Sequence, residues 1–296
     1  MSVKAFLRGA VVAALAGFSF LLPGAAAAEV PGVGGDDIFG FTSPTEIGNP
    51  GDTSFANEND GRFGKRDGTY RALNTKYEFG KTLSDSWWLA GSFFGAFYHV
   101  RDVPGLNDVS QSAFDGLSFE VEYRLLKRSM GNPFAISLSV EPRWGRIDGT
   151  AGEVSNSLGA AFKLFADAVV IPDTLFWAAN LQFTPQSAQD PMDRSHWINS
   201  SSTFASMALS YQFPSKTFVV GVEVHHHLAF DGAWLNHNIG NALYVGPTFL
   251  WRITDKIAFN TTYQPQVAGH AKGTPGRLDL DNFERAQFRA KVAVAF

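Results

Sequence analysis

The residues most suggestive of chemistry are three consecutive histidines, His225 to His227, preceded by Glu223. In an extended chain successive side chains point to opposite faces, so Glu223, His225 and His227 would share one face. Two imidazoles and a carboxylate at this spacing could ligate zinc. The pattern is also typical of lumenal polar residues near the aqueous end of a barrel strand. We favour this second interpretation and predict no metal site and no cofactor.

Hydrolytic chemistry would need a histidine base within hydrogen-bond reach of a hydroxyl, and a third group that orients the base. The nearest candidates, Ser195-His196 and His237-Asn238, fall in segments expected to be loops and have the wrong spacing. Asp279 and Asp281 supply two carboxylates, which are too few for a persuasive calcium site. We therefore predict no catalytic residue.

The elements that must position these side chains are read best from the end of the chain. From Ala286 to Phe296 every second residue is apolar, whereas Arg285, Arg289 and Lys291 fall on the other face. Such alternation is typical of a β-strand, and about 9–11 residues suffice to cross a bilayer at a tilt. We interpret this stretch as the closing strand of an outer-membrane barrel. Phe296 is then the expected signal for the barrel-assembly machinery.

Further alternating segments fill the chain between Thr69 and Gln264, and Thr53–Phe63 is a weaker candidate. Short turns alternate with longer connections, of which Val100–Ala113 and Pro185–Ser200 are the clearest. Bacterial transmembrane barrels have short periplasmic turns, longer extracellular loops and an even number of strands. We predict an all-β, antiparallel up-and-down transmembrane barrel of about 12 strands over residues 52–296. Ten and fourteen strands are the alternatives, and a soluble sandwich, which has shorter strands, is the competing architecture.

The N-terminal residues have the pattern of a secretory signal peptide. Lys4 and Arg8 precede an apolar run from Gly9 to Leu22, and small residues follow it before Glu29. The run is shorter than the roughly 20 residues of a membrane-spanning helix. We therefore predict that residues 1–28 are removed. Residues 29–51, rich in Gly and Pro, form a predicted periplasmic N-terminal segment that lies in the periplasm or folds into the barrel mouth.

Composition agrees with this compartment. The chain has 27 Phe, 7 Trp and 7 Tyr, 29 Gly and 14 Pro, and no Cys from which a disulfide or thiolate site could be built. Its net charge of −4 gives no electrostatic argument for nucleic acid. The predicted location is the outer membrane of a Gram-negative bacterium. The predicted partners are outer-membrane lipid and lipopolysaccharide, the barrel-assembly machinery and a small-molecule solute.

If the apolar strand faces contact lipid, the opposite faces fill the lumen. Charges of both signs occur on those faces in comparable numbers. They could pair across neighbouring strands and close the barrel, or line the route of a small polar or amphipathic solute; we favour a mainly structural network. The cations of the last strand need acidic partners, for which Glu78, Glu120, Glu122 and Glu223 are available. The predicted lumen-lining residues are Lys76, Glu78, Glu120, Glu122, Arg124, Glu141, Arg143, Lys163, Glu223, His225, His227, Arg252, Arg285, Arg289 and Lys291.

Several hairpin strings resemble those of a known family. YEFGKTLSDSWWLAGSFFGAFYH joins an aromatic-Gly pair, a short turn and an aromatic strand, and looks like hairpins of the "MetA pathway of phenol degradation" family. GRFGKRDGTYRAL, FDGLSFEVEYRLL and EPRWGRIDG also resemble uncharacterised α-proteobacterial barrels. The resemblance spans roughly residues 52–296. It implies an outer-membrane barrel associated with passage of hydrophobic or aromatic compounds, with no catalytic residue to carry over.

Three functional hypotheses follow from these patterns. The first is a monomeric barrel for passive passage or binding of small molecules. The second is a structural or adhesive barrel with a salt-bridged, closed lumen. The third is a lipid-modifying outer-membrane enzyme.

Overall fold

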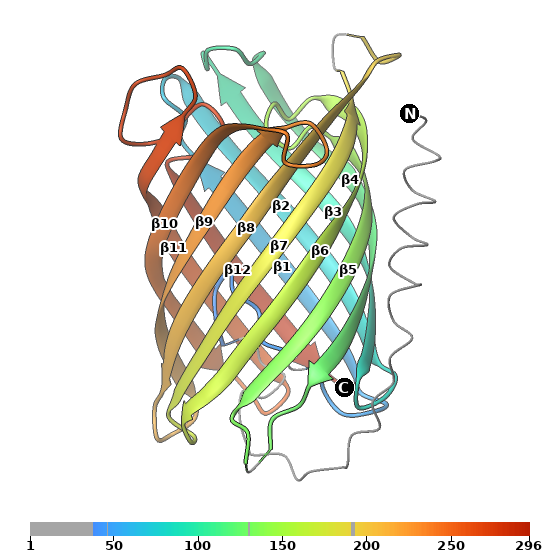
Figure 1. The fold of residues 1–296 in the computed structure, drawn as a ribbon, viewed down its shortest axis with the longest axis vertical. Helices are drawn as coiled ribbons and strands as arrows, with labels where there is room; N and C mark the ends of the chain where they lie inside the picture. Colours follow the sequence, from blue (N-terminus) through green and yellow to red (C-terminus); the bar gives the residue numbers. More distant parts are fainter. Residues whose placement is uncertain (1–37, 46, 130, 191–192) are drawn as a thin grey trace.

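The computed structural model describes residues 38–45, 47–129, 131–190 and 193–296, which include a closed barrel of twelve strands (Figure 1). Each strand is antiparallel to both neighbours, and β1 pairs with β12 to close the sheet. The predicted fold class and strand number are confirmed. The predicted signal peptide lies outside the described residues. The strands are β1 (Thr53–Phe63), β2 (Thr69–Thr82), β3 (Trp87–Arg101), β4 (Val109–Leu126), β5 (Phe134–Ile147), β6 (Val154–Ile171), β7 (Leu175–Gln189), β8 (Trp197–Gln212), β9 (Phe218–Asp231), β10 (His237–Arg252), β11 (Ile257–Ala271) and β12 (Ala286–Ala295).

The alternation of the sequence becomes an outer and an inner face. Phe79, Phe119 and Tyr263 are exposed on the outside, whereas Glu120 and Gln264 are buried on the inside. Closure of the sheet leaves no free edge, so the backbone polar groups have partners within it, as a bilayer requires. Among the described residues, no helix is long and apolar enough to span a membrane.

The strand ladders run further than alternation predicts at the end opposite the C-terminus. The loops predicted at Val100–Ala113 and Pro185–Ser200 are shorter than expected, and about half of each segment is strand, because β3 and β4 extend into the first and β7 and β8 into the second. Ladder hydrogen bonds join backbone groups and do not require apolar side chains. The ends of these strands are polar, and for that reason the sequence wrongly predicts loops there.

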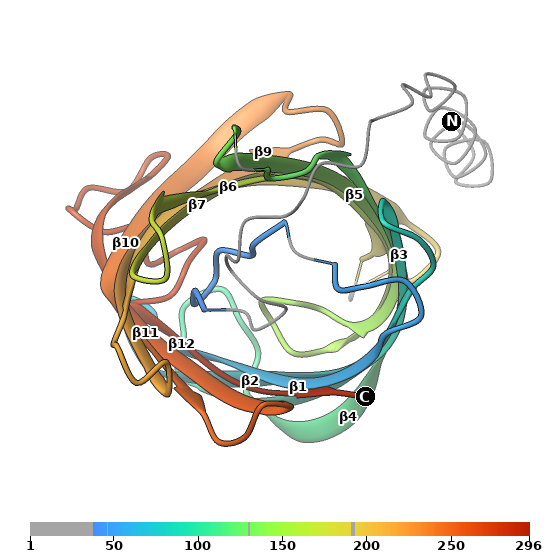
Figure 2. The same cartoon turned by 90° about the horizontal axis from the view of Figure 1, so that it is seen from below.

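The described part of the N-terminal segment, residues 38–45 and 47–52, crosses the interior of the barrel at the end where the C-terminus lies (Figure 2). Of the two positions that its composition allows, these residues take the one inside the mouth. Ile38 and Phe39 are buried there against apolar side chains at the strand ends. Their neighbours are Val169, Phe176, Ala178, Ala208, Val219, Leu250 and Ala258.

A second apolar cluster fills the lumen at the opposite end, built around Tyr70, Tyr98 and Val100. The β5–β6 loop folds inward onto it. Tyr70 donates its hydroxyl proton to the Thr150 carbonyl at 3.0 Å, and Tyr98 donates to the Gly149 carbonyl at 3.0 Å. The lumen therefore has an apolar cluster near each end, and its polar side chains lie between them.

Candidate functional site

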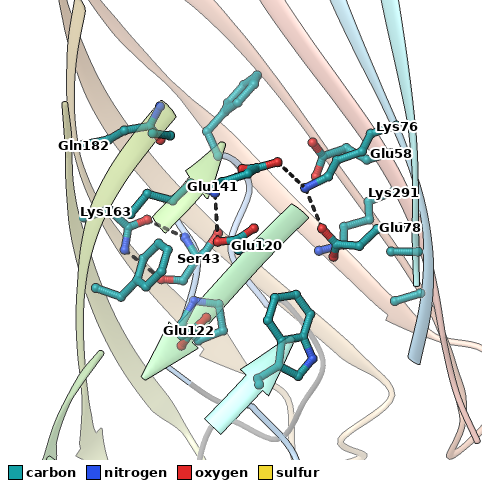
Figure 3. A pocket seen from close by; sticks show the side chains of 18 of the residues that line it. Ser43, Glu58, Lys76, Glu78, Glu120, Glu122, Glu141, Lys163, Gln182 and Lys291 are labelled. Carbon is teal, nitrogen blue, oxygen red and sulfur yellow. Dashed lines mark hydrogen bonds and ion pairs between the residues drawn. The ribbon is translucent and has the colours of Figure 1, made fainter. Parts of the chain in front are cut away.

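Between the two apolar clusters lies a cavity of about 1200 Å³. Side chains of most strands line it, together with Phe41, Ser43, Pro44 and Thr45 of the N-terminal segment. Figure 3 shows charged side chains pointing into it from opposite parts of the wall. This volume is in the range of small-molecule sites, so the cavity is the candidate functional site.

One wall of the cavity carries a continuous chain of ion pairs (Figure 3). On β2, the Lys76 ammonium lies 2.5 Å from Glu78 and 3.6 Å from Glu141 of β5. On β6, the Lys163 ammonium lies 2.5 Å from Glu141 and 2.9 Å from Glu120 of β4. Glu141 thus pairs with both lysines and joins the two halves of the chain.

Small side chains allow this chain to cross intervening strands. Ser92 of β3 and Ser118 of β4 face the lumen between Lys76 and Glu141. Ser92 donates to Glu78 at 3.4 Å, and Ser118 donates to Glu141 at 2.7 Å. Because serine is short and supplies a hydroxyl donor, the long lysine side chain can pass over it to β5.

Glu122, next along the inner face of β4, adds a further carboxylate to this wall. It is 8 % exposed, lines the cavity, and among the described residues its Oε1 atom has no hydrogen-bond partner. The wall therefore presents the carboxylates of Glu78, Glu120, Glu122 and Glu141 around two lysines. Lys291 and Arg124 also line the cavity, so charges of both signs face it.

Arg289 organises the neighbouring part of the wall. It donates to both carboxylate oxygens of Asp60 at 2.7 and 2.8 Å and lies 3.0 Å from Glu58. Its guanidinium also stacks 4.5 Å above the ring of Phe41. Two-point contact of this kind fixes the orientation of a guanidinium. The acidic partners of Arg289 therefore lie on β1, and are different from those that the sequence offered.

The wall formed by β7 and β8 is uncharged. Its lumenal residues carry amides and hydroxyls, which can donate and accept hydrogen bonds without adding charge. The cavity therefore faces charged groups on one side and neutral polar groups on the other. The neutral lining residues are Asn180, Gln182, Thr184, Gln186 and Ser202.

The histidine triplet forms part of an aromatic cluster. The ring of His225 lies 4.9 Å from that of Phe41, 4.8 Å from Tyr244 and 5.0 Å from His227. Glu223 is directed to the N-terminal segment, where it accepts from the Phe41 amide at 2.8 Å. Within the described part of the chain, no three His, Asp or Glu side chains are grouped as metal ligands.

A buried carboxylate holds the β11–β12 loop at the far end of the lumen. Glu284 lies 3.3 Å from Arg62 and 3.7 Å from Lys65. Burial raises the pKa of Glu284, but the two cations outweigh it, so that its pKa lies below the ordinary value. Burial likewise lowers the pKa of Lys65, and Glu284 offsets part of that effect. The ion pairs therefore tie this loop to β1 and to the loop that follows β1.

The structure divides the predicted lumen-lining residues into four groups. Glu223 and His225 are buried beside the N-terminal segment. Arg252 donates to the Gln212 side chain at 2.7 Å and to the Lys216 carbonyl, beside the β8–β9 turn. Arg285 is exposed and precedes β12, because that strand begins at Ala286. The others line the cavity: Lys76, Glu78, Glu120, Glu122, Arg124, Glu141, Arg143, Lys163, His227, Arg289 and Lys291.

Several lining residues were absent from the prediction. Glu58, Asp60 and Arg62 occupy alternate positions of β1 and line the cavity. Their two-residue spacing could have identified them as inward-facing. The outward-facing residues of this strand are also partly polar, however, which weakens the alternation of polar and apolar residues. Asp115, which pairs with Arg143 at 2.5 Å, lies near the segment predicted as a loop.

Comparison with solved structures places this fold among known outer-membrane barrels. The COG4313 outer membrane channel from Pseudomonas putida F1 superposes with a TM-score of 0.56 at 14% sequence identity, covering 83% of this chain and 96% of that one. The β domain of the Bordetella autotransporter BrkA gives a TM-score of 0.51 at 12% identity, covering 83% and 100%. At such low identity these likenesses show the shared barrel fold.

Comparison of the sequence adds one match. A family model described as "Family of unknown function (DUF6662)" matches residues 32–296. No curated protein matches the chain.

Proposed function

The chain belongs to the Family of unknown function (DUF6662), and for it we propose passive passage or binding of small polar molecules in the lumen of an outer-membrane barrel. The observation that carries the proposal is the cavity of about 1200 Å³ lined by charged and neutral polar groups. A barrel that served only to close its own interior would have no need of such a space.

An outer-membrane location is part of the proposal. Apolar side chains such as Phe79 and Leu181 are more than half exposed on the outer face, as lipid contact requires. The predicted signal peptide supports the same route of export, and outer-membrane lipid and lipopolysaccharide would then surround the barrel. The channel from Pseudomonas putida F1 shares the fold, which is consistent with this location.

The lining favours a polar solute over the hydrophobic or aromatic one that the hairpin resemblance implies. A molecule in this cavity meets a wall of paired charges around Lys76 and Lys163 and an amide wall around Gln182. A small polar solute that carries hydroxyl or amide groups can form hydrogen bonds with both walls. An apolar solute would leave buried polar groups without partners, which is costly.

The proposal is tested by single-channel recording of the mature protein in planar bilayers. We expect discrete conductance steps. Gln182→Trp should reduce the step size because it fills the cavity, whereas Phe183→Trp, one residue along the strand, should not. Equal steps in both variants would assign the current to another protein in the preparation.

The salt-bridged network supports one alternative function, a closed structural barrel. Lys163 is held between two carboxylates, and the N-terminal segment crosses the lumen. A correctly folded barrel that stays silent in bilayers and excludes small sugars and amino acids in liposome-swelling assays would favour this alternative and count against passage.

A further inference from the structure

The N-terminal segment is held in the lumen by side chains of the wall, and it adds no strand to the sheet. The backbone carbonyl of Ile38 accepts from Ser210 at 3.2 Å, and that of Phe39 accepts from Asn260 at 2.6 Å. Such contacts resemble those of a bound peptide more than those of a structural strand.

Glu223 of β9 is the principal anchor of this segment. Its carboxylate accepts hydrogen bonds from the amides of Phe41 and Thr42, from the Thr42 hydroxyl at 2.5 Å, and from Gln264 at 2.9 Å. Glu223 is 1 % exposed. A buried carboxylate with four donors makes strong, charge-assisted bonds and has little capacity left for water.

A second carboxylate repeats the arrangement three residues further along. Asp167 of β6 accepts from the Thr45 amide at 2.7 Å and from the Thr45 hydroxyl at 2.8 Å. Between the two anchors, the Asn180 side chain accepts from the Ser43 amide at 2.6 Å and donates to the Ser43 carbonyl at 2.8 Å. The wall thus recognises consecutive backbone groups and two threonine hydroxyls at a fixed spacing.

The fit between segment and wall is close at Gly40. A Cβ atom at that position would approach the Glu223 carboxylate and lie 2.8 Å from the Thr262 methyl group. On the other side of the anchor, Phe41 packs edge-on against His225 at 4.9 Å and lies under Arg289. Residues 38–45 therefore occupy a shaped binding surface on β6, β7, β8, β9 and β11.

The junction between this segment and β1 is held by contacts of its own. The Gly51 amide donates to the Thr82 carbonyl at 2.9 Å, and the Thr82 hydroxyl donates to the Ile47 carbonyl. The contacts that hold residues 38–45 to the wall are therefore separate from those that hold residues 47–52 to β2. Detachment of residues 38–45 would enlarge the cavity that they border.

We propose that residues 38–45 are a tethered ligand of the lumenal wall, and that its release from Glu223 and Asp167 opens the lumen. The surface fits a peptide that presents two hydroxyl residues three positions apart. This inference rests on the proposed passage function, since release matters only if solutes cross the barrel.

A reversible cross-link tests the proposal directly, because the chain contains no Cys. The hydroxyls of Thr42 and Ser206 lie 2.8 Å apart, so the double variant Thr42→Cys, Ser206→Cys can form a disulfide between segment and wall. We expect conductance to rise by about twofold or more when the disulfide is reduced. The single-cysteine variants should not respond to reduction, and equal conductance of the oxidised and reduced double variant would overturn the proposal.

A second measurement separates failure of this inference from failure of the proposed function, because it needs no current. A water-soluble maleimide is added to Thr42→Cys in liposomes, with and without Glu223→Gln. Loss of the charged anchor should speed labelling by about tenfold. Ser92→Cys, also buried in the lumen but distant from the segment, should label at the same rate in both backgrounds. Unchanged labelling at position 42 would show a permanently fixed segment even in a silent barrel.

Discussion

At the scale of single residues, the charged wall of the cavity depends most on Lys163, whose ammonium lies between Glu120 and Glu141. All three side chains are largely buried. Replacing the lysine would leave two neighbouring carboxylates without their shared counter-ion. The wall is therefore more sensitive to loss of this one cation than to loss of a surface charge.

We predict that Lys163→Met lowers the free energy of unfolding by about 3 kcal/mol. Lys216→Met is the matched control, because Lys216 pairs with Asp173 at 2.9 Å with both side chains more than half exposed. That change should cost about 1 kcal/mol or less. Urea unfolding in detergent, followed by tryptophan fluorescence, measures both values; equal losses would contradict the assigned role of Lys163.

The ion pairs of Glu284 predict that the stability of the β11–β12 loop depends on pH. Its pKa in the folded protein lies below the ordinary value of 4.5. Its ion pairs therefore stabilise the β11–β12 loop fully above about pH 4.5, and this contribution is lost as pH falls through the folded pKa. Amide hydrogen exchange of residues 279–284, corrected for intrinsic rates, should show protection falling below about pH 4.5. In Glu284→Gln, protection should be low throughout; a wild-type loop insensitive to pH would refute the assignment.

At the scale of elements, the inward β5–β6 loop depends on Gly152. This residue has a positive φ of 72°, and an added Cβ atom would lie 2.7 Å from the Cβ of Tyr98. Gly105, in the β3–β4 loop, has a similar φ of 80° with no atom within 4 Å of an added Cβ. The two glycines therefore separate backbone strain from steric exclusion.

We expect Gly105→Ala to cost about 1 kcal/mol through backbone strain. Gly152→Ala should cost about 2–3 kcal/mol, because it also displaces the loop from Tyr98. Thermal unfolding of the two variants in the same detergent gives the comparison. If both lose the same stability, the loop is not held by its fit against Tyr98.

The strands were predictable because lipid imposes a simple rule on them. An outward residue must be apolar, and the backbone must be paired, so alternation and an even strand number follow. The twelve strands and the lumenal side of Lys76, Glu141 and Lys163 could be deduced in this way. The strand ends beyond the bilayer could not, since the rule does not apply outside the hydrocarbon region.

The same rule does not predict most of the contacts within the site. The alternation of side chains along a strand identifies inward residues, but it does not identify their partners. Lys76, for example, reaches Glu141 across two intervening strands. The N-terminal segment has no strand periodicity, so its position depends on Glu223 and Asp167, which are distant in the sequence. These contacts become visible only when the barrel is closed.

At the scale of the whole molecule, Phe296 lies at the seam that closes the barrel. Phe296 is 67 % exposed, and its amide donates to the Thr53 carbonyl at 2.9 Å across the β1–β12 seam. We predict that deleting Phe296 lowers the yield of protein in the outer membrane, because the assembly machinery loses its terminal aromatic signal. Protein that does insert should lose about 1 kcal/mol of stability or less.

Phe213→Ala provides the control for that deletion. Phe213 is an exposed aromatic residue in the β8–β9 turn, at the same end of the barrel. Its loss removes similar apolar surface without altering the terminus. Cell fractionation and heat-modifiability on gels measure inserted protein; an undiminished yield after deletion of Phe296 argues against the signal role.

The position of the N-terminal segment also fixes an order of events during folding. Its anchors are remote in sequence, with Asp167 122 residues from Thr45, Glu223 181 residues from Thr42 and Asn260 221 residues from Phe39. Contacts of such long range form late. The N-terminal segment comes before every strand in the sequence, yet it is therefore among the last parts to become ordered. It can dock only after the strands that carry its partners have assembled.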